Sequence, residues 1–157
     1  MNDLHWISAV FSPTGGTAAI AKAITGGQGH VVDLSVPAPS TPVAGNTVLL
    51  AAAPVFGGRI PAVALERLAA LSGSGPAVAV AVYGNRDYED ALLELSDALK
   101  AGGFQMIGAA AFVAQHSIAP TIAQGRPDQA DLEAAASFGR AVLDKLAGPD
   151  PLAPVTV

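Results

Sequence analysis

Hydroxyl side chains and glycines are concentrated at residues 12–17 of this 157-residue chain, where the sequence reads Ser-Pro-Thr-Gly-Gly-Thr. The apolar run from Trp6 to Phe11 before it predicts a buried strand, and the alanine-rich stretch from Ala18 to Ile24 predicts a helix. Free backbone N–H groups and the positive end of the dipole at a helix start attract anions. Glycines allow close approach of the backbone, and hydroxyls donate hydrogen bonds to phosphate oxygens. The stretch therefore predicts a phosphate cradle, and the alternative is an ordinary strand-to-helix turn with a hydroxyl cap.

The residues that follow the glycines indicate which class of phosphate-containing ligand the turn could bind. A Walker loop has a Lys after its second Gly, whereas this chain has Thr17 and then Ala18. The three-glycine pattern of dinucleotide loops is absent as well. Hydroxyls and the helix dipole would have to hold the phosphate without a cationic side chain. This favours a monophosphate ester such as FMN over a nucleoside triphosphate with Mg²⁺.

Composition limits the class of protein. Hydrophobic residues make up 51% and charged residues 13% of the chain, which is typical of one compact globular domain, expected over residues 1–149 with a loose tail over residues 150–157. The net charge of −5 argues against a nucleic-acid partner. No apolar run reaches the roughly 20 residues that a membrane helix needs, and no basic secretory segment begins the chain, so we expect a cytoplasmic protein without membrane contact. The lack of cysteine excludes disulfides, thiolate nucleophiles and cysteine-ligated metals.

Apolar segments alternate with segments of helical periodicity. Strands are predicted over residues 5–11, 30–34, 47–53, 77–82 and 104–113, and helices begin near Gly16, Pro61, Asp87 and Asp128. In the second helix Leu65, Leu68 and Leu71 recur at helical spacing, and Gly73 is predicted to end the helix. The alternation predicts an α/β fold with a parallel, doubly wound sheet. The glycine-rich turn after the first strand favours the strand order 2-1-3-4-5, with the ligand at the carboxyl ends of the first and third strands.

The motif Ser12-x-Thr14-Gly15-x-Thr17 resembles the FMN phosphate loop of the flavodoxins, with Gly16 where the usual loop has Asn. The resemblance is closer to the flavodoxin-like half of bacterial and archaeal flavodoxin–ferredoxin fusion proteins. This chain lacks the cysteines that their ferredoxin half carries. The resembling segments are Phe-Ser-Pro-Thr-Gly (11–15), Pro-Val-Phe-Gly-Gly-Arg-Ile-Pro (54–61), Tyr-Gly-Asn-Arg (83–86), Ala-Phe (111–112), His-Ser (116–117) and Gly-Arg-Pro-Asp (125–128).

The resemblance implies a flavodoxin-like three-layer sandwich that binds FMN and transfers electrons to or from a redox partner such as a ferredoxin or a reductase. It implies that residues 12–17 bind the phosphate, that residues 54–60 border the isoalloxazine ring, and that residues 83–88 meet its pyrimidine edge. The implied FMN-binding residues are Ser12, Pro13, Thr14, Gly15, Gly16, Thr17, Pro54, Val55, Phe56, Gly57, Gly58, Arg59, Tyr83, Gly84, Asn85, Arg86 and Tyr88, with His116 as a further candidate.

Several roles have an alternative. Phe56 would either pack on the isoalloxazine ring or belong to the core. Of the two tyrosines, Tyr88 is the better candidate for a second stacking ring, and Tyr83 would be the last core residue of its strand. A guanidinium of Arg59 or Arg86 near the ring would raise the flavin potential. The alternative is that the two arginines face solvent or pair with a carboxylate such as Asp87 or Glu89. We expect no catalytic triad, because His116 has no acid at motif spacing. We expect no other catalytic side chain and no metal site, because no carboxylate pair or His/Asp cluster suggests hydrolysis or metal binding.

Three functions remain open on these residues. The first is an FMN-binding electron carrier, in which the flavin supplies the chemistry. The second is an FMN-dependent reductase that uses NAD(P)H, with Arg59 or Arg86 binding an anionic substrate. The third is a non-redox module on the same fold that binds another phosphate ligand or a protein.

Overall fold

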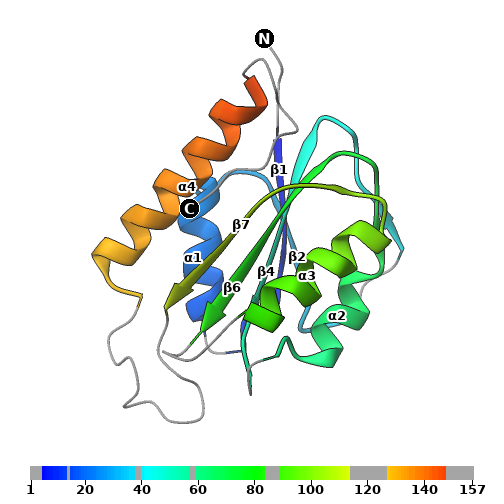
Figure 1. Ribbon diagram of the computed structural model, residues 1–157, viewed down its shortest axis with the longest axis horizontal. Helices are drawn as coiled ribbons and strands as arrows, with labels where there is room; N and C mark the ends of the chain where they lie inside the picture. Colours follow the sequence, from blue (N-terminus) through cyan, green and yellow to red (C-terminus); the bar gives the residue numbers. More distant parts are fainter. Residues whose placement is uncertain are drawn as a thin grey trace.

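The computed structural model describes residues 5–13, 15–37, 40–56, 59–83, 89–113 and 127–147. Strands and helices alternate along most of this chain (Figure 1). The strands are β1 (His5–Val10), β2 (His30–Asp33), β3 (Thr41–Pro42), β4 (Thr47–Pro54), β5 (Leu71–Ser72), β6 (Pro76–Tyr83) and β7 (Gln105–Val113). The helices are α1 (Gly16–Thr25), α2 (Ala62–Leu68), α3 (Glu89–Ala101) and α4 (Gln129–Ala147).

The large sheet has five parallel strands in the order β2-β1-β4-β6-β7. Strands β4 and β6 lie inside the sheet, where both of their faces are covered, and they are apolar and buried over residues 48–54 and 76–82. The labels differ from the predicted order 2-1-3-4-5 because two short unpredicted strands, β3 and β5, form a separate two-stranded sheet. Within the large sheet alone, the strands follow one another as second, first, third, fourth and fifth along the chain.

The prediction that Leu71 lies on a helix was wrong. Helix α2 ends at Leu68, and Leu71 begins β5, where its side chain is 1% exposed in the core. The backbone N–H of Thr41 donates to Ala70 O at 2.7 Å, and that of Val43 donates to Ser72 O at 2.7 Å. Pairing with residues 41–43 therefore replaces the helical hydrogen bonds that would have continued α2.

The helices cover the sheet on both faces and give the predicted three layers. Helices α1 and α4 lie on one face, and α2 and α3 lie on the other (Figure 1). Side chains alternate along β4, so that Leu50 packs in the core under α1 and α4 while Leu49 packs in the core under α2 and α3. In the part of the chain that the structure describes, no helix combines the length and apolar character needed to cross a bilayer.

Helix α4 begins as predicted. The side chain of Asp128 accepts the N–H of Asp131 at 2.9 Å, and the side chain of Asp131 accepts the N–H of Asp128 at the same distance. This reciprocal capping box satisfies two N–H groups at the helix start. The inward face of α4 carries the buried residues Ala135, Gly139, Val142 and Leu146, and Leu132 is partly buried against the same core.

Candidate functional site

The carboxyl ends of β1, β4 and β6 meet at one edge of the sheet. The N–H of Phe11 donates to Ala52 O at 3.1 Å, and the N–H of Val55 donates to Val82 O at 2.9 Å, so the backbones stay side by side to the strand ends. From β1 the chain passes to β2 on one side of the sheet, while β4 and the later strands lie on the other side. The edge between β1 and β4 is therefore the topological switch point, where open α/β sheets bind ligands.

The turn from β1 into α1 exposes the helix N-terminus at this edge. Gly15 is the N-cap and has a φ of 92°, a left-handed conformation that glycine adopts without steric cost. The first helical hydrogen bond runs from the N–H of Ala19 to Gly15 O at 3.0 Å. The first turn of α1 contains no acidic residue, so no side-chain carboxylate from that turn occupies the positive end of the helix dipole.

Ser12 is tied into this helix start. Its Oγ accepts the N–H of Ala18 at 3.0 Å, which leaves the hydroxyl hydrogen of Ser12 available for an anion. The N–H groups of Gly16 and Thr17 have no acceptor among the described residues. The Thr17 side chain is buried at 3% exposure, Pro13 is exposed, and Thr14 lies outside the described residues. The structure thus brings Ser12 together with the first N–H groups of α1.

The segment after β4 makes a tight turn at the same edge. The N–H of Phe56 donates to Arg59 O at 2.8 Å, and the N–H of Arg59 donates to Phe56 O at 3.1 Å. Gly57 and Gly58 lie between them, outside the described residues. Phe56 is half-buried and belongs to neither core cluster, which disfavours the interpretation of Phe56 as a core residue.

The two residues before this turn belong to the fold. Pro54 is the last residue of β4 and is buried. The side chain of Val55 is 7% exposed and packs in the core under α2 and α3. Its N–H is engaged by Val82 O and its side chain by the core, so Val55 contributes to the fold.

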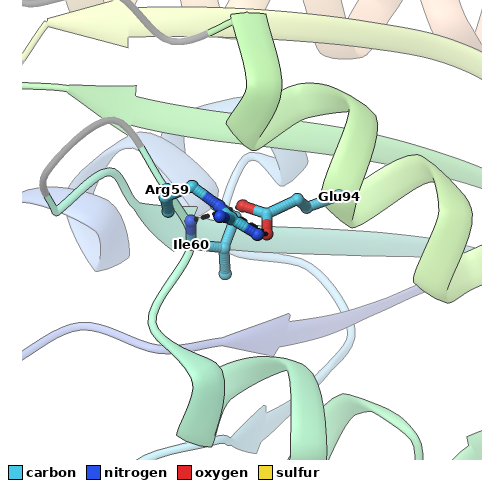
Figure 2. Close-up of polar contacts among 3 residues, drawn as sticks. All are labelled: Arg59, Ile60 and Glu94. Carbon is cyan, nitrogen blue, oxygen red and sulfur yellow. Dashed lines mark hydrogen bonds and ion pairs between the residues drawn. The ribbon is translucent and has the colours of Figure 1, made fainter.

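Arg59 is held by a carboxylate on α3 (Figure 2). Its Nε and Nη2 donate to Oε2 of Glu94 at 2.9 and 2.6 Å, and Oε1 of Glu94 accepts the N–H of Ile60 at 3.0 Å. Of the two interpretations of Arg59, the structure supports pairing with an acid. The acid is Glu94 and neither of the two expected examples, Asp87 and Glu89. No local signal points to Glu94, which lies 35 residues away.

The pKa of Glu94 is lowered, chiefly by the hydrogen bond from Arg59. The hydrogen bond from the N–H of Ile60 and the charge of Arg59 lower it further, while partial burial of the carboxylate opposes them. The same hydrogen bond raises the pKa of Arg59, helped by the charges of Glu94 and Asp90. Both groups are therefore charged at neutral pH. At its present position Arg59 is a paired cation.

The lowered pKa predicts a pH-dependent role of Glu94 in stability. Because the carboxyl titrates lower in the folded state than in the unfolded state, its contribution is complete above its ordinary value of 4.5 and is lost as pH falls through the lowered pKa. The difference in free energy of unfolding between the wild type and Glu94→Gln should be constant between about pH 6 and 8 and shrink below about pH 4.5. Urea unfolding at a series of pH values measures this difference.

Glu66→Gln removes one carboxylate from the exposed surface of α2 and is the matched control. Its difference from the wild type should stay near zero at every pH. A Glu94→Gln difference that does not change with pH would show that the ion pair contributes nothing to stability.

The remaining predicted site residues are only partly described. Tyr83 ends β6, is half-buried and packs against the core under α2 and α3, in agreement with its interpretation as the last core residue of the strand. Gly84, Asn85, Arg86, Tyr88 and His116 lie outside the described residues. In the described ranges, no group of three or more histidine and carboxylate side chains could hold a metal ion.

No family model matches the sequence, and a comparison with curated proteins found no match. Solved structures do share its fold. The WrbA-like flavodoxin from Agrobacterium tumefaciens superposes with a TM-score of 0.56 at 16% identity, over 85% of this chain and 91% of that one. The Streptococcus pneumonia TIGR4 flavodoxin gives a TM-score of 0.54 at 15% identity, over 89% of this chain and 99% of that one.

A third match is a larger protein. The Flv1 flavodiiron core from Synechocystis sp. PCC6803 superposes with a TM-score of 0.51 at 16% identity over 91% of this chain, which spans only 37% of that one. At such identities the likeness concerns the fold. The chain has a flavodoxin-like fold.

Proposed function

We propose that this protein binds FMN at the carboxyl edge of β1 and β4 and transfers electrons through it. The observation that supports the proposal is that two turns lie at the topological switch point: the turn before α1, which exposes the N-terminus of that helix, and the Phe56–Arg59 turn. Similar solved structures include proteins named as flavodoxins. FMN presents a phosphate and a flat ring, and the two turns match these two halves of the ligand.

The turn before α1 would hold the phosphate. The N–H groups of Gly16 and Thr17 and the hydroxyl of Ser12 would donate to phosphate oxygens, and the helix dipole would favour their negative charge. Residues 12–17 contain no cationic side chain, so the backbone carries most of this interaction. Such a site suits a monoester phosphate at the end of a larger ligand.

The Phe56–Arg59 turn would border the ring. The half-buried Phe56 is available for stacking, which adds about 0.5–1.5 kcal/mol beyond the area buried. Arg59 is engaged with Glu94 and so is a poor candidate for binding an anionic substrate or a nicotinamide phosphate. This favours an electron carrier over a reductase that recruits Arg59. Bound FMN supplies the redox chemistry, and electrons would pass to or from a protein such as a ferredoxin or a reductase.

Visible absorption and fluorescence titration with FMN test this proposal. We expect stoichiometric binding with quenched flavin fluorescence, and no oxidation of NADH or NADPH by the loaded protein when no partner protein is added. Turnover of either nucleotide with a free electron acceptor would identify a reductase. No FMN binding at about micromolar concentration, a range typical of specific ligands, would reject the proposal.

A further inference from the structure

Glu94 anchors the Phe56–Arg59 turn from outside the sheet. The residues on either side of the turn are already fixed, because Val55 and Ile60 are both buried in the core under α2 and α3. Core packing does not include Phe56 or Arg59. Glu94 holds this part of the turn in place. One of its carboxylate oxygens accepts hydrogen bonds from the Arg59 guanidinium, and the other accepts the N–H of Ile60 (Figure 2).

The same contact directs the charge of Arg59 toward α3. The Arg59 side chain is 70% exposed, whereas that of Glu94 is 19% exposed, so the carboxylate is the more enclosed partner. Asp90, four residues before Glu94 on α3, also acts on Arg59 by its charge. Two acids of α3 therefore balance the guanidinium. A ring at the sheet edge would meet the turn and not an unpaired cation.

We propose that Glu94 is a positioning residue for the flavin ring, a role that rests on the proposed FMN function. By holding Arg59 and Ile60, Glu94 fixes the turn, and with it Phe56, at the place where the ring binds. Glu94 acts through the turn and does not touch the phosphate-binding residues. Its loss should therefore affect the ring half of the ligand and leave the phosphate half unchanged.

Riboflavin, which has the ring without the phosphate, separates the two halves. Glu94→Gln should weaken riboflavin and FMN by the same factor, about tenfold, so that the ratio of their affinities stays constant. The Gln carbonyl can still accept the N–H of Ile60, and a cooperative thermal unfolding transition with a midpoint lowered by no more than a few degrees at neutral pH would show that the fold is retained. Glu66→Gln on α2 is the control and should bind both flavins as the wild type does.

Arg59→Gln removes the other side of the ion pair. It should give the same loss as Glu94→Gln, and the double variant should lose no more than either single variant, because both substitutions remove one shared contact. Additive losses in the double variant would overturn the proposal, since they would mean that the two residues act separately on the ring.

A readout without flavin tests the anchor itself. Amide hydrogen exchange at Phe56 and Arg59, whose N–H groups close the turn, should become faster in Glu94→Gln. Unchanged exchange, or unchanged riboflavin affinity in a wild type that binds flavins, would overturn the role of Glu94 and leave the FMN proposal intact. A wild type that binds neither FMN nor riboflavin would reject both.

Discussion

Gly16→Asp should abolish most FMN binding while leaving riboflavin binding close to that of the wild type. Gly16 is the first residue of α1, beside the N–H groups that would hold the phosphate. A carboxylate there repels the phosphate dianion. At an effective dielectric constant of about 20, two unit charges some 4 Å apart interact by about 4 kcal/mol, so a loss of at least about a hundredfold in FMN affinity is expected. Fluorescence titration with both flavins measures the two affinities.

The same substitution should stabilise the protein without ligand. An acidic side chain in the first turn of a helix interacts favourably with the dipole by about 0.3–1 kcal/mol, and α1 has none in the wild type. Weaker FMN binding together with equal or higher stability cannot result from damage to the fold. Gly16→Asn is the isosteric control without charge, and it should bind FMN at least as well as the wild type. Equal losses for FMN and riboflavin in Gly16→Asp would show that this turn does not hold the phosphate.

Gly139→Ala should destabilise the protein by about 3 kcal/mol, the upper part of the usual range for overpacking. A Cβ at Gly139 of α4 would lie 1.8 Å from the backbone oxygen of Ile24 in α1. Backbone atoms cannot rotate aside, so the two helices would have to separate. In a helix with free space at this position, Gly→Ala would instead stabilise the protein by about 1 kcal/mol, because Ala has the higher helix propensity. The expected change in the free energy of unfolding therefore has the opposite sign to the change that helix propensity predicts.

Urea unfolding of Gly139→Ala measures the effect, and Gly45→Ala is the matched control. A Cβ at Gly45 would meet no atom within 4 Å, so this variant should unfold close to the wild type. Gly139 lies where α4 contacts α1, away from the Phe56–Arg59 turn. The folded fraction of Gly139→Ala should therefore keep its affinity for riboflavin. A Gly139→Ala variant as stable as the wild type would show that the helices can separate at little cost.

The sequence alone determined the features whose causes lie within one stretch of chain. The apolar runs of β4 and β6, the cap at Asp128 and the turn from β1 into α1 each depend on neighbouring residues, so local composition predicts them. In the turn from β1 into α1, a strand, hydroxyl residues, glycines and a helix follow one another directly along the chain. The parallel sheet followed from the order of these local elements.

Only the tertiary structure decided the features that join distant segments. The end of α2 before Leu71 depends on pairing with residues 41–43, the partner of Arg59 lies 35 residues away on α3, and Gly139 is required by the backbone of Ile24 in another helix. In each case the residue type suits several surroundings, since a leucine fits a helix or a strand and an arginine fits solvent or an ion pair. The surroundings of such a residue depend on the distant segment that packs against it in the folded protein, and the local sequence does not predict that contact.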